Sequence, residues 1–314
     1  MRRIRLKLWG VFSLFLLSFC LSGCGGETSE TSSAPSPPSE NAKPRQTLHS
    51  FLLPEASGSD LYENELASID ASHTSDGYVM IRYSGSCDKA KIQITDPGSV
   101  TYTYTLLGSE YETFPLSGGN GSYHIDVLEH VSDDLYALIF SQDLSVSVGD
   151  EFLPFLYPNQ YAWYTSDSDA VQLGIELSDT AYGDLDYVEK VYHYIIENIA
   201  YETNLAENIP LDYIPDIDLT LQNGSGICFD YAALMTSLLR SQGIPTRLEV
   251  GYSGRAYHAW ISVYLAEIGW VDNIIEFNGH SWSLMDPTLA AGNDSRAVEK
   301  YIGDGSNYTV KYYY

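Results

Sequence analysis

A cysteine, a histidine and an aspartate follow one another in the C-terminal half of the chain in the order of a thiol catalytic triad. Cys228 lies in the stretch Gly-Ile-Cys-Phe-Asp-Tyr-Ala, His258 lies in Tyr-His-Ala-Trp, and Asp286 stands directly before Pro287. An enzyme that transfers acyl groups needs a nucleophile, a base and a group that orients the base, supplied by separate elements. No other cluster in the chain offers all three, so these residues are the candidate catalytic groups.

Cys228 is expected at the start of a helix. The stretch Gly224-Ser225-Gly226 can turn tightly before it, and apolar residues then recur at helical spacing until Gly243 and Pro245 end the pattern. The unpaired N–H groups and the positive dipole end at such a position favour the thiolate and can donate to a developing oxyanion. The alternative is a buried cysteine without a catalytic role.

His258 opens an alternating run that reaches Tyr264 and predicts a strand, which would hold the imidazole rigidly. Asp286 precedes Pro287, so a strand would end there and the carboxylate could accept the second imidazole N–H. Taken alone, the histidine could be structural and the aspartate could form a turn. The presence of both residues after Cys228, in the order of a catalytic triad, favours the catalytic interpretation.

Before the candidate site, short alternating strands separated by turn residues predict a small antiparallel β-sandwich. A helix follows it, from Asp186 to Ile199, where apolar residues recur every three or four positions. Asn278-Gly279 predicts a hairpin, and a last strand is expected from Tyr308 to Tyr313. The predicted strands of the sandwich are Tyr78–Tyr83, Ala90–Thr95, Thr101–Leu106, Ser122–Leu128 and Tyr136–Phe140.

The N-terminal segment predicts export. A cationic start is followed by an apolar run from Leu8 to Leu21, which is too short to favour a spanning helix and ends in small residues. The ending Leu-Ser-Gly-Cys resembles a bacterial lipobox. That resemblance implies cleavage before Cys24 and a lipid on Cys24, whereas the alternative is an ordinary secretory signal.

The chain is strongly acidic, with 16 Lys and Arg against 42 Asp and Glu and a formal charge of −26. Cleavage after residue 23 would leave 12 basic residues against the same 42 acidic ones, a charge of −30. This charge argues against nucleic acid as a partner and against electrostatic adhesion to anionic lipid. Attachment to a membrane would therefore depend on the lipid at Cys24.

The four cysteines leave little room for a disulfide framework. Cys20 would leave with the signal and Cys24 would carry the lipid, so only Cys87 and Cys228 remain. A disulfide between these two would destroy the candidate nucleophile. We expect Cys228 to be free and Cys87 to be a small apolar filler.

Taken together, the motifs of residues 180–290 resemble the bacterial transglutaminase-like superfamily. The motifs that carry the resemblance are Gly226–Ala232, Gly243–Arg247, Gly251-Tyr252, His258-Ala259-Trp260 and Trp282 followed by Asp286-Pro287-Thr288. The resemblance implies an α+β, papain-like core with Cys228 as nucleophile, His258 as base and acid, and Asp286 as the orienting group. Gln222 stands six residues before Cys228, where papain-like enzymes often hold a glutamine of the oxyanion hole.

We therefore expect a lipoprotein on the outer face of the cell membrane that acts on protein or peptide amides through a thioester, by hydrolysis or amide transfer. No cofactor and no metal are expected, because no cluster of potential ligands has suitable spacing. A catalytically inactive binding module and an assembly subunit that works through its sandwich are the alternatives. The expected boundaries are 1–23 for the signal peptide, 24–70 for a disordered tether and lead-in, 71–150 for the sandwich, 151–179 for a linker and 180–314 for the catalytic domain.

Overall fold

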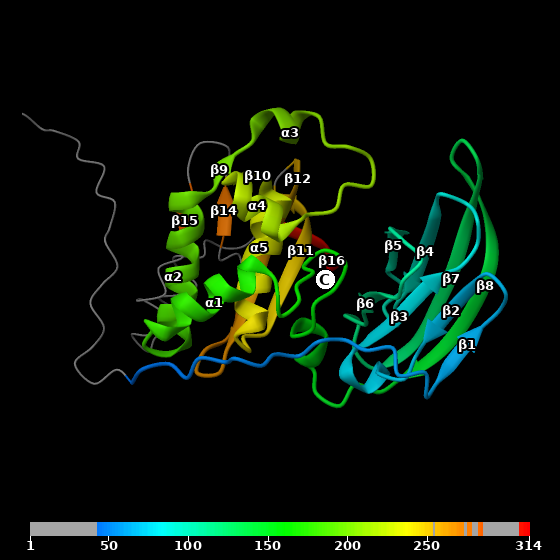
Figure 1. The fold of residues 1–314 in the computed structure, drawn as a ribbon, viewed down its shortest axis with the longest axis horizontal. Helices are drawn as coiled ribbons and strands as arrows, with labels where there is room; N and C mark the ends of the chain where they lie inside the picture. Colours follow the sequence, from blue (N-terminus) through cyan, green and yellow to red (C-terminus); the bar gives the residue numbers. More distant parts are fainter. Residues whose placement is uncertain (1–42, 254, 273–274, 278–281, 285–307) are drawn as a thin grey trace, which may run out of the picture. The chain divides into compact units, whose positions relative to one another are not determined.

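The computed structural model describes residues 43–253, 255–272, 275–277, 282–284 and 308–314, which belong to one compact unit. Figure 1 shows antiparallel sheets combined with a group of helices, so the predicted α+β class is confirmed. Within these ranges no helix is long and apolar enough to cross a bilayer.

Two four-stranded antiparallel sheets form the first part of this unit. One has the order β1-β2-β3-β6, with strands Leu61–Glu63, Ala67–Asp70, Tyr78–Tyr83 and Glu112–Pro115. The other has the order β5-β4-β7-β8, with strands Thr101–Leu106, Ala90–Thr95, Gly121–Ser132 and Leu135–Val146. Alternate side chains such as Ile92 and Tyr104 join Ile81 of the first sheet in one buried core. These are the paired sheets that the alternating sequence predicts.

The first sheet starts before residue 71, because β1 and β2 belong to it. Both strands are too short to show an alternating pattern, and β2 buries the polar Ser68 and Asp70. The Asp70 carboxylate accepts hydrogen bonds from the backbone N–H groups of Gly58 and Ser72, at 2.7 and 2.9 Å. These bonds offset the cost of burying it, and residues 61–70 are part of the sandwich.

The second part of the unit is built on a sheet of order β13-β12-β11-β16, with strands Gly269–Val271, Ala256–Leu265, Thr246–Ser253 and Tyr308–Tyr313. Helix α5 spans Cys228–Ser241 and lies against β11 and β12 (Figure 1). Every residue from Asp230 to Ser241 is buried, as expected of a helix covered on all sides. The helix predicted after Cys228 and the predicted last strand are both confirmed.

Two further helices pack on α5, namely α1 (Asp169–Asp179) and α2 (Gly183–Asn198). The second confirms the predicted helix, but α1 lies in the segment 151–179 that was expected to be a linker. Its contact with α5 is made by small residues, since a Cβ added to Gly174 would come within 3.2 Å of the Ser241 hydroxyl. The sequence analysis missed α1, although its buried residues Ala170, Val171, Gly174 and Ser178 recur at helical spacing.

Short elements connect these layers. They are the 3-10 turns η1 (Thr74–Asp76) and η2 (Leu153–Phe155), the helices α3 (Thr203–Glu207) and α4 (Ile217–Asn223), the parallel pair β9 (Ala200–Tyr201) and β10 (Ser225–Gly226), and the antiparallel pair β14 (Ile275–Phe277) and β15 (Trp282–Leu284). The last pair is the hairpin predicted from Asn278-Gly279, although these two turn residues lie outside the described ranges.

A buried arginine joins the end of α5 to three other segments. Arg240 is 2% exposed and donates to the carbonyl oxygens of Tyr157 at 2.8 Å, Thr246 at 2.6 and 2.9 Å, and Tyr314 at 2.6 Å. Burial lowers the pKa of this guanidinium to about 10, so it still carries its charge at neutral pH. One side chain thereby connects α5 with β11, with the end of β16 and with the segment before α1.

The lead-in before the sandwich is anchored by Arg45, which lies in the stretch expected to be a flexible tether. Its guanidinium donates to the Asp184 carboxylate and the Ser178 hydroxyl, both at 2.8 Å, and to the Gln242 carbonyl. It also lies 4.8 Å from the ring centre of Tyr187. A polar anchor of this kind leaves no trace in the hydrophobic pattern, so this end of the predicted tether is corrected to a packed segment.

We expect Arg45→Ala to lower the free energy of unfolding by about 2–3 kcal/mol, because it removes several charge-assisted hydrogen bonds from a largely covered site. Urea denaturation followed by circular dichroism measures this change. Lys43→Ala is the matched control, since Lys43 is exposed and two positions away. Equal losses in the two variants would contradict the anchoring role.

Candidate active site

Two glycines shape the turn that leads into α5. Gly224 has a φ of 59°, in the left-handed region, and ends α4. Gly226 is needed for another reason, because a Cβ there would lie 2.7 Å from the Cβ of Asp230. The tight turn predicted before Cys228 is therefore confirmed, with a separate physical requirement at each glycine.

The Asp230 carboxylate fixes the first turn of α5. It accepts the backbone N–H of Ile227 at 2.8 Å and the hydroxyl of Tyr213 at 2.7 Å, and its side chain is buried. Burial raises the pKa of this carboxyl, while the two hydrogen bonds act in the opposite direction. The sequence analysis did not single out either side chain, although an acidic residue three positions after a helix start is a known capping signal.

The Cys228 thiol is half-buried at the N-terminus of α5, next to β12. Burial raises its pKa above the ordinary thiol value, whereas hydrogen bonds from the backbone N–H groups of Ala259 and Phe229 lower it. The N–H groups at the helix start lower the pKa of Cys228, as expected, but burial raises it by more, so the net shift is upward. The bond to Ala259 places the sulfur beside the residue that follows His258.

His258 lies on β12, as the alternating pattern predicts, opposite Gly251 of β11. Its half-buried ring stacks on Trp260, with 6.1 Å between ring centres and 24° between planes. A Cβ on Gly251 would lie 2.1 Å from the Thr309 carbonyl oxygen, so the approach of β16 requires glycine there. The register of three strands thus determines where the imidazole is held.

A buried carboxylate supports the stacked pair from β11. Glu249 accepts the indole N–H of Trp260 at 2.6 Å and the hydroxyl of Ser262 at 2.7 Å, and it is 3% exposed. Burial raises its pKa to about 7, against the lowering effect of those two hydrogen bonds. The sequence analysis missed Glu249, and only the β11–β12 register, which pairs it with Trp260, could have revealed it.

An aromatic series links the sandwich to the neighbour of Cys228. The Phe229 ring contacts Tyr161 with 5.2 Å between centres, and Tyr161 stacks on Tyr104 of β5 at 5.7 Å. Tyr161 also meets Tyr314 edge-on at 4.6 Å. The first turn of α5 is therefore packed against a wall to which both parts of the unit contribute.

Of the other predicted site residues, one is described by the structure and two are not. Gln222 is exposed in the last turn of α4, and Asp286 and Cys24 lie outside the described residues. Cys87 and Cys228 are free thiols, as expected, with the Cys87 sulfur 3.5 Å from the His130 carbonyl oxygen. In the part of the chain that the structure describes, no group of three or more His, Cys, Asp and Glu side chains is arranged to hold a metal ion.

We expect Glu249→Gln to remove a pH dependence of stability. A carboxyl whose pKa rises from 4.5 to about 7 on folding favours the native state when protonated, so its contribution is lost as pH rises through that window. The unfolding free energy of the wild type minus that of the variant should fall by about 3 kcal/mol between pH 4 and pH 8. Denaturant titrations at several pH values test this, and a constant difference would contradict it.

Comparison with known proteins agrees with this fold. A family model of the transglutaminase-like superfamily matches residues 171–273. The uncharacterized protein YebA of Bacillus subtilis is 30% identical over 123 residues, which make up 32% of this chain and 16% of YebA. The chain thus spans less than a fifth of the length of that relative.

Two solved structures are also similar. A candidate cysteine protease from Cytophaga hutchinsonii aligns with a TM-score of 0.35 at 14% identity, over 67% of this chain and 66% of that one. A candidate protease from Parabacteroides distasonis aligns with a TM-score of 0.26 at 19% identity, over 32% of this chain and 22% of that one. On the match of the family model, residues 171–273 form a domain of the transglutaminase-like superfamily.

Proposed function

We propose that the protein is a cysteine-dependent enzyme that acts on protein or peptide amides, with Cys228 as nucleophile and His258 as base. The observation that carries this proposal is the packing of the start of α5 against β12, where the N–H of Ala259, the next residue after His258, lies close enough to the Cys228 sulfur to lower its pKa. It supports a thiol and an imidazole brought together by a helix end and a strand. Asp286 is proposed as the carboxylate that orients the imidazole.

In this proposal His258 removes the thiol proton, and the thiolate attacks the carbonyl carbon of the amide. The backbone N–H groups at the start of α5 are better placed than the exposed Gln222 to donate to the resulting oxyanion. The imidazolium then protonates the departing amine and leaves a thioester on Cys228. Attack by water completes hydrolysis, and attack by an amine completes transfer.

The raised pKa of Cys228 makes the base essential to this scheme. A thiol that burial keeps neutral is a poor nucleophile near pH 7 unless a neighbour accepts its proton as it reacts. The buried surroundings also exclude water from the developing charges, which strengthens each hydrogen bond to them. The proposal therefore assigns ionisation of the thiol to His258 and not to the helix dipole alone.

Iodoacetamide labelling across pH 5–10 tests whether His258 activates the Cys228 thiol. Every protein that is compared carries Cys87→Ala, so that Cys87 is not labelled. Although burial raises the pKa of the Cys228 thiol, the parent should react with an apparent pKa below the ordinary thiol value, because the neutral imidazole accepts the thiol proton during the reaction. The His258→Ala variant should react with an apparent pKa above the ordinary thiol value, because the thiol is still buried but has no base. Its labelling at pH 7 should be at least about tenfold slower than that of the parent. Cys228→Ala measures residual labelling, and Tyr257→Ala is the control, since that neighbouring side chain is exposed.

Identical profiles for the parent and the His258→Ala variant would contradict the proposed pair. They would favour the second candidate, a surface module that retains the fold without catalysis. A binding module has no need for a thiol whose reactivity depends on a neighbouring base. The labelling profile therefore separates the two candidates without knowledge of the substrate.

We further propose that Cys24 carries the lipid that attaches the protein to the outer face of the cell membrane, where it meets protein or peptide substrates. Each CH₂ group of a lipid chain that is buried in the bilayer contributes about 0.8 kcal/mol to membrane binding, and stable attachment takes two or more membrane-binding groups. Cys24→Ser should move the protein from the membrane fraction to the soluble fraction. Cys20→Ser is the matched control and should stay in the membrane fraction; release of both variants, or of neither, would count against the assignment.

A further inference from the structure

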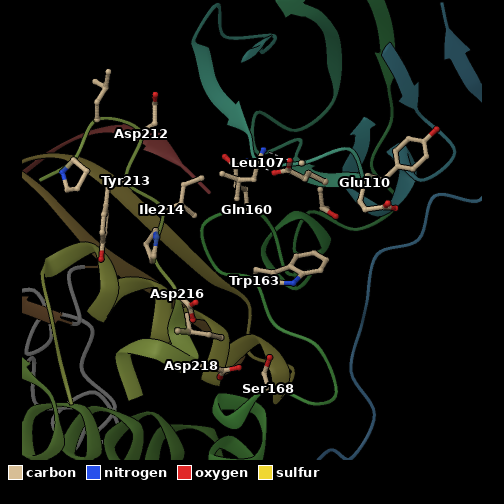
Figure 2. Close-up of a pocket in the computed structure, with 18 residues that line it drawn as sticks. Leu107, Glu110, Gln160, Trp163, Ser168, Asp212, Tyr213, Ile214, Asp216 and Asp218 are labelled. Carbon is tan, nitrogen blue, oxygen red and sulfur yellow. Dashed lines mark hydrogen bonds between the residues drawn. The ribbon is translucent and has the colours of Figure 1, made fainter. Parts of the chain in front are cut away.

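A pocket of about 880 Å³ lies between the β5–β6 turn of the sandwich and the segment that leads into α4. Figure 2 shows Glu110 and Trp163 on one side of it and Tyr213 and Asp216 on the other. Neither Cys228 nor His258 lines this pocket. It is a separate site, to which both parts of the compact unit contribute.

The side chains around the pocket are rich in hydrogen-bond acceptors and carry negative charge. The carboxylates that line it are Glu110, Glu112, Asp212, Asp216 and Asp218, and none of its described lining residues is Lys, Arg or His. Lys91 pairs with Asp212 at 3.1 Å, and Arg82 stacks on the lining residue Tyr111 at 4.8 Å. These two cations leave most of the negative charge uncompensated.

Two buried oxygens in the wall have no hydrogen-bond partner. Gln160 is 6% exposed, and its amide nitrogen donates to the Thr105 carbonyl and the Glu112 carboxylate, both at 2.7 Å. These two acceptors fix the orientation of the amide and leave its oxygen, Oε1, without a hydrogen-bond partner. The hydroxyl of Thr113, a residue that is 1% exposed, also has no partner. Both oxygens are covered by protein atoms, so they make the wall behind the pocket polar but are not contacts that a ligand makes directly.

We propose that this pocket binds the cationic side chain of a lysine or arginine in the polypeptide that the enzyme acts on, an inference that rests on the proposed function. An ammonium or guanidinium group supplies only donors and positive charge, which complements a wall of acceptors. The Trp163 side chain is 44% exposed and offers a ring for the aliphatic stem or for a cation–π contact.

The pocket is connected to the first turn of α5 by one hydrogen bond. Tyr213 lines the pocket, and its hydroxyl donates to the Asp230 carboxylate that holds the Ile227 N–H before Cys228. A basic side chain bound in the pocket would therefore lie beside a residue that is hydrogen-bonded to the first turn of α5, which positions the nucleophile. The pocket would then select polypeptides with a basic residue near the amide that reacts.

The test is the binding of two fluorescein-labelled pentapeptides to the full chain carrying Cys228→Ala, followed by anisotropy. One peptide has arginine at its centre, and the other has citrulline, which keeps the shape and loses the charge. The arginine peptide should bind at least about tenfold more tightly. Its affinity should fall as salt rises, because exposed charges contribute to the contact.

Glu110→Gln should weaken binding of the arginine peptide about threefold and leave the citrulline peptide unchanged. Glu110 suits this test because it is exposed, so the substitution spares the fold. Glu65→Gln, an exposed carboxylate of the sandwich outside the pocket, is the matched control and should bind as the parent does. Equal affinity for the two peptides, or equal behaviour of the two variants, would overturn the proposal.

The outcome is independent of the catalytic assignment. Binding is measured in a protein without the nucleophile, whereas the thiol–imidazole pair is tested by alkylation. If the arginine peptide binds no better than the citrulline peptide but labelling depends on His258, the proposed role of the pocket is rejected and the proposed enzyme is retained. Arginine preference without base-dependent labelling would keep a cation-binding site on a non-catalytic module, and would reject its role in positioning a substrate.

Discussion

The position of the candidate nucleophile depends on how α5 is held at its two ends. At the C-terminal end, the buried Arg240 donates to carbonyl oxygens from three other segments, and its removal would leave these acceptors unpaired in the interior. At the N-terminal end, Asp230 binds the Ile227 N–H and the Tyr213 hydroxyl. A helix fixed at both ends by buried charges can neither slide nor rotate freely, so the place of Cys228 follows from them.

The sandwich contributes to this constraint from outside the matched family segment. Tyr104 of β5 stacks on Tyr161, which in turn contacts Phe229 in the first turn of α5. Aromatic pairs of this kind add to the burial of their surface and favour defined ring geometries. The sandwich is thus part of the wall behind the candidate site, in agreement with its place in the same compact unit as α5.

The sequence predicts correctly the elements with a long periodic pattern of apolar residues. It does not reveal elements that are short or that make their contacts through small or polar residues. It predicted α2, α5 and β16, because apolar residues recur there over one or more full turns or alternate cleanly. It missed α1, whose contact with α5 depends on Gly174, and β1 and β2, which are too short to alternate. Glu249 and Gln160 could not be found either, because their burial depends on strand register and on contacts between the two parts.

Burial acts in the same direction on the acidic groups around the candidate site. It raises the pKa of Cys228, Asp230 and Glu249, and each of them receives hydrogen bonds that act against this shift. Such surroundings penalise free charge and strengthen each directed contact. The separate pocket, in contrast, has carboxylates that are exposed to solvent, such as Glu110. The two sites would therefore have different roles. The buried site would favour proton transfer between paired groups, and the solvated pocket would attract a cationic substrate.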